Sequence, residues 1–390
     1  MAEWVERKIS DIGTVVGGAT PSTKKLENYE EGKIAWITPK DLSTFSGRYI
    51  ERGERNITEI GLKSCSTQLL PPNTVLFSSR APIGYVAIAA NEVCTNQGFK
   101  SVIPNENTDP LFLFYLLKYN KDKIEGMGSG TTFKEVSGNT MKNIVVNVPN
   151  DKKVQEKIAA ILGSIDNKIE ENERINNNLF GQAKALFKNW FVDFEPFSTD
   201  NTMPETWRMG TVGEIIELHD SKRIPLSGSE RDKMEKIYPY YGATSLMDYV
   251  DNYLFDGIYL LLGEDGTVVD DKGFPILQYI DGKFWVNNHA HILTGKLGYS
   301  VEELYLLFSL TNIKSIVTGA VQQKVSQANL KKVPAIIPPV EVLNQFDDII
   351  QPIFAEIRNL KNENQRLSSI RDSILPKLMS GELDVSDIGL

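Results

Sequence analysis

Two long helical stripes dominate the pattern of apolar and polar positions. From Lys152 to about Trp190 the chain contains no proline, and apolar residues recur at alternating steps of four and three. This spacing predicts an amphipathic helix with a heptad-like apolar face. The stripe runs through Ile158, Leu162, Ile165, Ile169, Asn172, Asn176, Leu179, Ala183, Leu186 and Trp190.

A second stripe repeats the first one later in the chain. Its positions are Phe346, Ile350, Ile353, Ile357, Leu360, Asn364, Leu367, Arg371, Ile374 and Leu378, each 188 residues after its counterpart. Asn176 and Asn364 therefore occupy the same place in two otherwise apolar seams, where a polar side chain can fix the register. A helix of about 35 residues is about 50 Å long, too long to be buried in one domain. We expect the two helices to bury each other in an antiparallel pair, with a globular unit at each end; the alternative is that each stripe packs into the core of its neighbouring domain.

Each stripe follows a segment of short strands, turns and short helices, so the fold class is mixed α/β (α+β). Near its start, the second segment ("ETWRMGTVGEII") resembles the beginning of the chain ("AEWVERKISDIG"). The segments close on "GTTFKEVSGNTMKNIVVNVP" (130–149) and "GAVQQKVSQANLKKVPAIIP" (319–338), which align without a gap. We predict an internal pseudo-twofold repeat. It comprises a first globular domain at 1–150, a spacer helix and hinge at 151–195, a second globular domain at 196–339, and a second helix with a C-terminal segment at 340–390.

Composition narrows the class of protein. The 390 residues are 41% hydrophobic and 24% charged, as in globular proteins of two or three domains. No window is apolar enough to span a membrane, the N-terminus has no signal-peptide core, and the two cysteines lack a C-x-x-C spacing, so we expect a cytoplasmic protein. The net charge of -9 counts against a self-sufficient nucleic-acid binder, because lysine and arginine supply most of the affinity for phosphate.

Several motifs resemble one family. "LFKNWFVDFEPF" (186–197) and "ILPKLMSGELDVSDI" (374–388) are similar to the central and C-terminal segments of the DNA-specificity (S) subunits of type I restriction-modification systems. "YPYYGATSLMDYVDNYLFDG", "LLLGEDGTVV" and "FWVNNHAHIL" resemble one class of their target-recognition domains. In the first domain, "VLFSSRAPIGYVAIA" and "TNQGFKSVIP" resemble another class. The resemblance covers nearly the whole chain.

The resemblance implies a function in recognition. Two target-recognition domains would each read one half of a bipartite double-stranded DNA target, and the paired helices would set the separation of the halves. The partners implied are two modification subunits, which methylate adenine with S-adenosylmethionine, and restriction subunits, which use ATP and Mg. The chain itself is expected to be non-catalytic and to bind no cofactor. The rival interpretation is a coiled-coil scaffold for protein interactions, without DNA sequence specificity.

Enzyme motifs are absent from the sequence. It has no acidic or amide residue followed by Pro-Pro-aromatic, as an adenine methyltransferase needs, and no G-x-x-x-x-G-K-[ST] phosphate loop. His289 and His291 lie two apart, which on a strand places them on one face and suggests half of a metal site. Only His219 remains as a third imidazole and no cysteine lies nearby. We therefore predict no metal there and favour base contacts or internal hydrogen bonds.

Candidate DNA contacts are polar loop residues, because asparagine and glutamine suit adenine, arginine suits guanine, and carboxylates accept from cytosine. In the first domain they are Ser78, Ser79, Arg80, Asn96, Gln97, Thr131, Thr132 and Lys134. In the second they are Arg223, Tyr240, Tyr241, Glu264, Asp265, Asn287, Asn288, His289, Gln322, Gln323 and Lys324. Because the two sets differ, we expect two unlike half-sites.

The hinge segment is unusually aromatic. Phe187, Trp190, Phe191 and Phe194 lie close together in sequence, with more apolar surface than one helix end can hide. Surplus apolar surface marks a contact site. Two interpretations are open: docking of a modification subunit, or packing at the junction between the helices.

Overall fold

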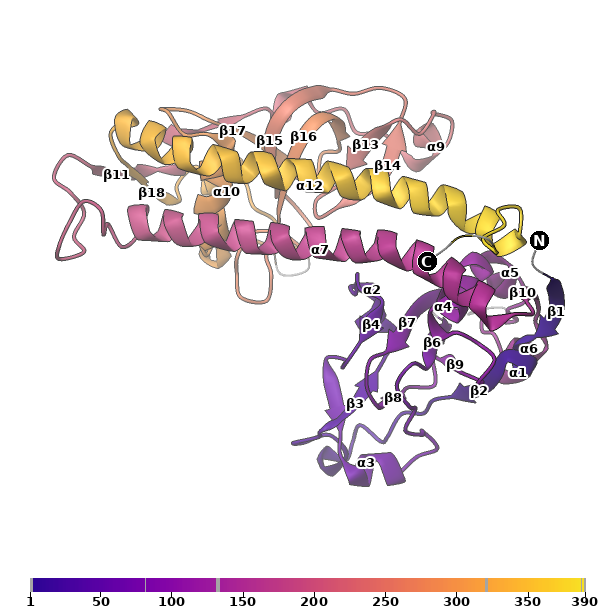
Figure 1. Cartoon of the computed structure of the whole chain (residues 1–390). Coiled ribbons are helices and arrows are strands. Elements are labelled where there is room, and N and C mark those ends of the chain that lie inside the picture. Colours follow the sequence, from indigo (N-terminus) through magenta and orange to yellow (C-terminus); the bar gives the residue numbers. More distant parts are fainter. Residues whose placement is uncertain (1–2, 81, 131–133, 320–321, 387, 389–390) are drawn as a thin grey trace. The chain divides into compact units, whose positions relative to one another are not determined.

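The computed structural model describes residues 3–80, 82–130, 134–319, 322–386 and 388. Its contacts divide the chain into two compact units, and each unit takes part of both long helices (Figure 1). Unit 1 comprises Met1–Glu171 and Glu363–Leu390, and unit 2 comprises Asn172–Asn362. The helices are α7 (Lys152–Phe191) and α12 (Val340–Ser380). Each long helix therefore contributes one part to unit 1 and the other part to unit 2.

Unit 1 is built on a five-stranded sheet. Its strand order is β2-β9-β6-β7-β4, and a smaller sheet has the order β5-β3-β8. The strands are β1 (Trp4–Lys8), β2 (Gly13–Gly17), β3 (Ile34–Ile37), β4 (Tyr49–Ile50), β5 (Arg55–Ile57), β6 (Val75–Ser79), β7 (Ile83–Ala89), β8 (Val93–Thr95), β9 (Lys100–Pro104) and β10 (Val145–Pro149). The short helices are α1 (Ile9–Ile12), α2 (Pro39–Ser43), α3 (Glu59–Lys63), α4 (Pro110–Tyr119), α5 (Lys121–Gly126) and α6 (Gly138–Asn143).

The core of unit 1 forms where α4 meets the sheet and the long helices. Asp109 caps α4 by accepting from the Phe112 amide, and Pro110 occupies its first turn, where the missing N–H costs nothing. The run from Phe112 to Leu117 is buried all round, as expected of a helix packed on more than one side. Apolar residues of α7 and α12 join the same core, among them Ile158, Leu162, Leu378 and Met379.

Unit 2 is built on a six-stranded sheet of order β12-β17-β15-β16-β13-β14. Its strands are β11 (Arg208–Thr211), β12 (Ile216–Leu218), β13 (Tyr238–Tyr241), β14 (Leu246–Val250), β15 (Phe255–Gly263), β16 (Leu277–Val286), β17 (Ala290–Gly295) and β18 (Pro334–Ile337). Its short helices are α8 (Val212–Ile215), α9 (Gly228–Arg231), α10 (Val301–Leu310) and α11 (Gln327–Leu330). The N-terminus of α10 has a capping box of Ser300 and Glu303, and its apolar side packs on β15, β16 and β17.

The two units repeat one plan. An outer antiparallel pair, β1 with β10 in unit 1 and β11 with β18 in unit 2, joins the start and end of each domain. Inside it, β2 pairs antiparallel with β9, and β12 pairs antiparallel with β17. The repeated sequence stretches end in β10 and β18 and lead into α7 and α12. The predicted mixed α/β architecture with an internal repeat is confirmed.

The long helices run antiparallel within each unit. In unit 1 the Asn364 amide donates to the Ile169 carbonyl at 3.2 Å, while Arg371 reaches back to Asp166. In unit 2 the rings of Phe187 and Phe346 lie 5.7 Å apart. Leu162 and Phe346 also belong to the cores of their units, so the stripes serve both the helix pair and the neighbouring domain. Among the described residues, no helix is long and apolar enough to cross a membrane.

Candidate functional site

Both units form the same corner from three loops. In unit 1, corner 1 joins Arg80 after β6, the turn 96–98 and residues 129–130 and 134–135; backbone bridges connect Arg80 and Ser129 with Glu135. In unit 2, corner 2 joins the loop 264–267 after β15, the turn 287–289 and residues 318–319 and 322–324. There, bridges connect Asp265 and Thr318 with Lys324. Glu135 and Lys324 are therefore equivalent positions that carry opposite charges.

The backbone hydrogen bonds of the two corners also correspond. In corner 1 the Ser79 amide donates to the Gly98 carbonyl at 2.7 Å, and the Ser79 carbonyl accepts from the Val136 amide at 2.9 Å. In corner 2 the Glu264 amide donates to the His289 carbonyl, and the Glu264 carbonyl accepts from the Val325 amide, both at 2.8 Å. Val136 and Val325, which occupy the same position of the two repeated stretches, thus make the same backbone contact in each corner.

The central turn of each corner depends on an asparagine. The Asn96 Oδ1 atom accepts from the Gly98 amide, and the Asn287 Oδ1 atom accepts from the His289 amide, each at 2.8 Å. A side-chain oxygen that bonds its own backbone two residues on is the Asx turn that asparagine favours. Asn287 is also buried, with 4% of its surface exposed. Both asparagines therefore shape the loops, and their neighbours Gln97 and Asn288 are the exposed residues of the turns.

Ser78 and Ser79 support corner 1 from inside the sheet. Both are fully buried. The Ser78 hydroxyl donates to the Pro82 carbonyl and accepts from the Tyr85 amide, each at 2.8 Å, and the Ser79 hydroxyl donates to the Gly98 carbonyl at 3.2 Å. Direct DNA contact by Ser78 and Ser79 does not fit this burial, so that prediction is corrected.

Arg80 and Lys134 are the accessible cations of corner 1. The Arg80 side chain is 35% exposed and lies 3.7 Å from the Glu135 carboxylate, which also takes the ammonium of Lys100 at 3.2 Å. Lys134 is exposed on the loop, and the Gln97 amide oxygen accepts from the Thr20 hydroxyl. Thr131 and Thr132 lie outside the described residues. Corner 1 thus presents a loosely paired guanidinium and an amide.

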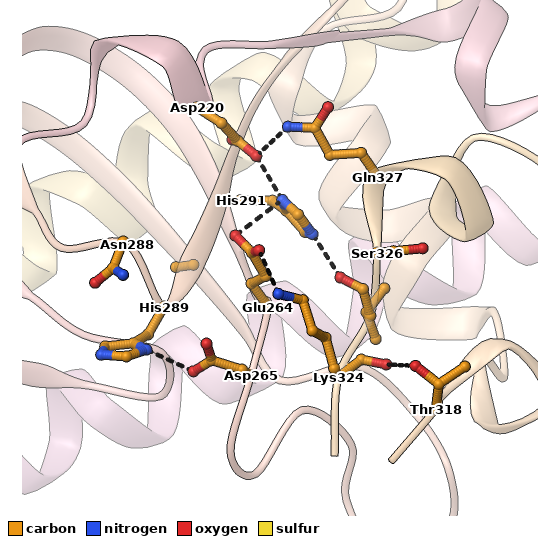
Figure 2. Close-up of polar contacts among 12 residues, drawn as sticks. Asp220, Glu264, Asp265, Asn288, His289, His291, Thr318, Lys324, Ser326 and Gln327 are labelled. Atoms are coloured by element: carbon orange, nitrogen blue, oxygen red, sulfur yellow. Dashed lines mark hydrogen bonds and ion pairs between the residues drawn. The ribbon is translucent and has the colours of Figure 1, made fainter. Parts of the chain in front are cut away.

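Corner 2 contains a network of buried charges (Figure 2). His291 lies with its Nδ1 atom 2.6 Å from the Asp220 carboxylate and its Nε2 atom 2.8 Å from the Val325 carbonyl. Arg223 donates to the Glu264 carboxylate at 2.7 Å and to the Ala290 carbonyl at 2.7 Å. The Arg223 side chain is 13% exposed and that of Glu264 15%. The network fastens the loop of Glu264 to β17 and to the segment before α11.

Asp220 holds the centre of this network. It accepts from the Ile292 amide at 2.9 Å and from the Gln327 amide at 2.6 Å, in addition to its contact with His291. Burial raises the pKa of Asp220, but these hydrogen bonds and the charge of His291 outweigh burial, so the pKa lies below its ordinary value. The carboxylate is therefore ionised and links its own segment to β17 and to the start of α11.

A metal-like grouping lies in the same network. Ligand atoms of Asp220, Glu264 and His291 lie within 4.8 Å of one another. Arg223 and Lys324 already supply positive charge, at 2.7 and 3.4 Å from the Glu264 carboxylate, where a bound cation would compete with them. The arrangement is a hydrogen-bonded ion network of the kind that buried charges need.

The three histidines do not converge on one site. His289 lies in the turn before β17, and its Nδ1 atom is 2.5 Å from the Asp265 carboxylate. His291 faces Asp220 inside the unit, and the His219 Nε2 atom lies 2.7 Å from the Thr294 hydroxyl. The idea that His289 and His291 share one face of a strand is wrong, because the Asx turn ends the strand pattern before Ala290.

The exposed part of corner 2 differs from that of corner 1. The His289 side chain is 45% exposed and that of Lys324 52%, while Asn288, Gln322 and Gln323 are exposed. A pocket of about 820 Å³ includes two of these residues, Gln322 and Gln323, in its lining; the others are Gly266, Thr267, Val269, Asp270, Asp271, Lys314, Val317 and Gly319. Two amides, two carboxylates and one ammonium group thus line a polar hollow.

Tyr240 and Tyr241 are packing residues of β13. Tyr240 is 1% exposed, its hydroxyl accepts from the Leu226 amide at 3.0 Å, and the Arg231 guanidinium lies 4.9 Å from its ring centre. The Tyr241 ring packs edge-on against Phe284, and burial raises its pKa to about 12. Direct base contact by Tyr240 does not fit its burial, and Tyr241 is half-buried in the same sheet.

The hinge aromatics pack inside unit 2. Phe187, Phe191 and Phe194 are 1%, 2% and 8% exposed, and Trp190 packs against the same cluster. The Phe191 ring lies 5.7 Å from Trp207 and 4.9 Å from Phe346. These contacts fit the second interpretation of the hinge aromatics, packing at the junction between the helices. Of the seam asparagines, Asn364 bonds the Ile169 carbonyl in unit 1, and Asn176 is half-buried on α7 in unit 2.

Sequence reasoning missed several supporting residues. Asp220, Gln327, Lys100 and Glu135 were not among the candidates, yet they hold the corners together. Their signal is in the repeat itself, because Glu135 and Lys324 stand at the same position of the two copies with opposite charges. Lys100 and His291 likewise each lie four residues after the asparagine of the turn.

Comparisons with known proteins identify the family. The family model described as type I restriction modification DNA specificity domain matches residues 1–179 and 204–369. The chain is 34% identical to the type I restriction enzyme MjaIX specificity subunit of Methanocaldococcus jannaschii, over 99% of this chain and 95% of that relative. The chain belongs to the type I restriction-modification DNA specificity family. It is also 23% identical to the type I restriction enzyme EcoprrI specificity subunit of Escherichia coli, over 94% of this chain and 92% of that one.

A solved structure shares the family fold. The type I restriction-modification S subunit of M. genitalium aligns with a TM-score of 0.57 at 17% identity, over 97% of this chain and 96% of that chain. The two stretches matched by the family model fall one in each copy of the internal repeat. The resemblance drawn from the hinge and domain motifs is thereby confirmed.

Proposed function

We propose that this member of the specificity family reads a bipartite, asymmetric DNA target, one half with each corner. The observation that carries the proposal is that the two corners share a backbone framework but present different side chains. A common framework gives each unit the same way of approaching DNA. Different groups on it give each unit a different base preference.

The chemistry of each corner suggests what it reads. In corner 1, Arg80 is suited to the O6 and N7 acceptors of guanine and Gln97 to adenine. In corner 2, Asn288, Gln322 and Gln323 offer amides, while the pair of His289 and Asp265 combines a ring nitrogen with a carboxylate. A carboxylate accepts from cytosine but repels phosphate, so Asp265 fits base reading better than backbone contact.

The role proposed for the chain is binding and not catalysis. In corner 2, ion pairs join the side chains of Asp220, His291 and Glu264 to one another and to Arg223. These contacts favour a structural role of the network, holding the corner in shape, over a catalytic role. Methyl transfer with S-adenosylmethionine would belong to two modification subunits, and ATP- and Mg-dependent cleavage to restriction subunits. Partners that surround the DNA would also supply the phosphate contacts that a chain of net charge -9 lacks.

Genome-wide methylation mapping tests this function. Cells that carry the chain with its modification subunit would be compared with cells that lack only the chain. We expect one asymmetric bipartite motif to lose methylation on deletion. Arg80→Ala should relax one half of that motif, and His289→Ala the other half, while Lys142→Ala, at an exposed position of helix α6, should change neither.

Each outcome is decisive for the role of the chain. Relaxation confined to a different half for each corner variant supports the assignment of one half-site to each unit. Unchanged methylation after deletion, with the modification subunit shown to be active, would reject DNA specificity. It would favour the rival function, a protein-interaction scaffold based on the paired helices.

A further inference from the structure

A buried triad in unit 1 joins the first domain to both long helices. The Tyr115 hydroxyl on α4 donates to the Asp166 carboxylate on α7 at 2.6 Å. The other oxygen of that carboxylate accepts from the Arg371 guanidinium on α12 at 2.7 Å. Tyr115 is fully buried, Asp166 is 5% exposed, and the Arg371 side chain is 19% exposed. One carboxylate on α7 thus contacts two further elements, α4 and α12.

Unit 2 has a triad of the same composition. The Tyr279 hydroxyl on β16 donates to the Glu302 carboxylate on α10 at 2.6 Å. The Arg358 guanidinium on α12 lies 3.0 Å from the same carboxylate oxygen and also donates to the Tyr279 hydroxyl. Glu302 is 3% exposed and Tyr279 6%. In both units, a tyrosine and a carboxylate receive an arginine from α12.

Both triads lie in largely buried surroundings. Burial raises the pKa values of Tyr115 and Tyr279. Around the second triad, Tyr305 and Phe354 pack at 5.7 and 5.4 Å from the Tyr279 ring centre. Burying such charges costs about as much free energy as their attraction returns, so their contribution to net stability is small. Their geometry, however, tolerates little displacement.

We infer that the triads Tyr115–Asp166–Arg371 and Tyr279–Glu302–Arg358 are positioning elements that set where each recognition domain sits on the paired helices, and hence the spacing between the two half-sites. This inference rests on the proposed function. A domain packed on a helix only by apolar side chains can shift along it, because hydrophobic contact is non-directional. A hydrogen-bonded buried charge permits one register, as polar residues do in coiled-coil seams.

The size of the effect follows from helix and DNA geometry. A helix rises about 1.5 Å per residue, and successive base pairs along DNA lie about 3.4 Å apart. A slip of about two residues along α12 therefore corresponds to about one base pair of half-site spacing. A shift of that size separates the Arg371 guanidinium from its carboxylate, because charge-assisted hydrogen bonds hold their atoms at about 2.7–2.9 Å.

Apolar replacement of whole triads tests the inference without unfolding the protein. Removing one partner leaves an uncompensated buried charge and is strongly destabilising, whereas replacing all partners with apolar residues of similar size is often neutral. The unit 1 variant is Tyr115→Phe, Asp166→Leu, Arg371→Met; the unit 2 variant is Tyr279→Phe, Glu302→Leu, Arg358→Met. Arg366→Met is the control, because Arg366 is exposed on the same helix.

Methylation mapping with the modification subunit is the readout, and circular dichroism checks that each variant is folded. We expect the bases of both half-sites to be unchanged, while methylation at spacings one base pair longer or shorter rises about tenfold, or about 1.4 kcal/mol of lost discrimination. Wild-type spacing in both folded triple variants would overturn the inference, as would changed half-site bases. A wild-type chain that directs no bipartite methylation would instead overturn the proposed function.

Discussion

Glu303 is the most strongly perturbed carboxyl of unit 2. It is fully buried at the N-terminus of α10, where its Oε2 atom accepts from the Ser300 amide at 2.8 Å. Burial raises its pKa to about 8, despite that hydrogen bond, and Asp347 adds to the rise. Within the described residues, the Oε1 atom has no hydrogen-bond partner. At neutral pH the folded protein therefore holds a proton that an unfolded chain would release.

Replacement of Glu303 should remove a pH dependence of stability. Because the folded pKa lies above the unfolded value of about 4.3, the contribution of the protonated side chain is complete below pH 4 and is lost as pH rises to about 8. The loss is at most about 1.4 kcal/mol per pH unit. We expect Glu303→Gln to raise the melting temperature at pH 8 more than at pH 5.

Differential scanning calorimetry across pH 5 to 9 measures this effect. Glu356→Gln is the matched control, since Glu356 is exposed on α12 of the same unit and should not alter the pH profile. Parallel profiles for Glu303→Gln and the wild type would show that Glu303 does not titrate in this range.

Glu264 allows buried and exposed charge pairs to be compared at one carboxylate. It contacts Arg223, whose side chain is 13% exposed, and Lys324, whose side chain is 52% exposed. Removing the buried partner leaves an uncompensated charge, so we expect Arg223→Met to lower the free energy of unfolding by about 3–5 kcal/mol. Lys324→Met should cost less than about 1 kcal/mol. Chemical denaturation measures both, and equal losses would contradict the argument from burial.

At the scale of elements, the hinge cluster ties the end of α7 to the start of α12 within unit 2. Phe191 contacts Phe187, Trp207 and Phe346 with ring centres 4.8, 5.7 and 4.9 Å apart. Truncating a buried phenylalanine removes its burial and leaves a cavity. We expect Phe191→Ala to destabilise unit 2 by about 3–5 kcal/mol.

The neighbouring Val192 provides the comparison. It is 48% exposed, so Val192→Ala should change stability by less than about 0.5 kcal/mol. Urea denaturation followed by near-ultraviolet circular dichroism reports on the aromatic cluster. A small loss for Phe191→Ala would mean that the cluster does not anchor the helix ends.

The long helices were predictable because their signal is local and periodic. The stripe and the absence of proline place a helix from Lys152 to about Trp190, and α7 is Lys152–Phe191. Pro338 and Pro339 mark the start of the second, which begins at Val340. Loop side chains carry no such signal. Ser79 looks like an exposed loop residue in "SSRAP", but its partner Gly98 is distant in sequence, so its burial follows only from the folded sheet.

At the scale of the molecule, the internal repeat could be predicted from the sequence, but the contacts that its residues make at the corners could not. The aligned stretches from Gly130 and Gly319 predict two copies of one plan. They do not reveal that Glu135 and Lys324 bridge to Arg80 and Asp265, because those loops lie more than fifty residues away. Only the comparison of the two folded corners shows that these equivalent positions, with opposite charges, occupy the same place in each corner.

The net charge of the molecule bears on how it holds DNA. With 42 basic and 51 acidic residues, the chain repels phosphate overall, and its exposed corner cations are few in each unit. Counterion release makes the logarithm of the binding constant fall with the logarithm of salt concentration by about 0.9 per neutralised phosphate. We therefore expect the chain alone to bind its mapped duplex weakly and with a shallow salt dependence.

Addition of modification subunits should raise both the affinity and the steepness of that dependence, because new phosphate contacts would come from the partner. Fluorescence anisotropy of a labelled target duplex between about 50 and 300 mM salt measures the salt dependence of binding for the chain alone and for the complex, with a duplex of shuffled half-sites as control. We expect the two slopes to differ by the contribution of roughly a few phosphates. The preference for target over shuffled duplex should persist in the complex, because in the proposed function the base contacts come from the corners. If the isolated chain binds as tightly and with the same slope as the complex, its own surface supplies the phosphate contacts, and the division of labour between base reading and backbone binding is wrong.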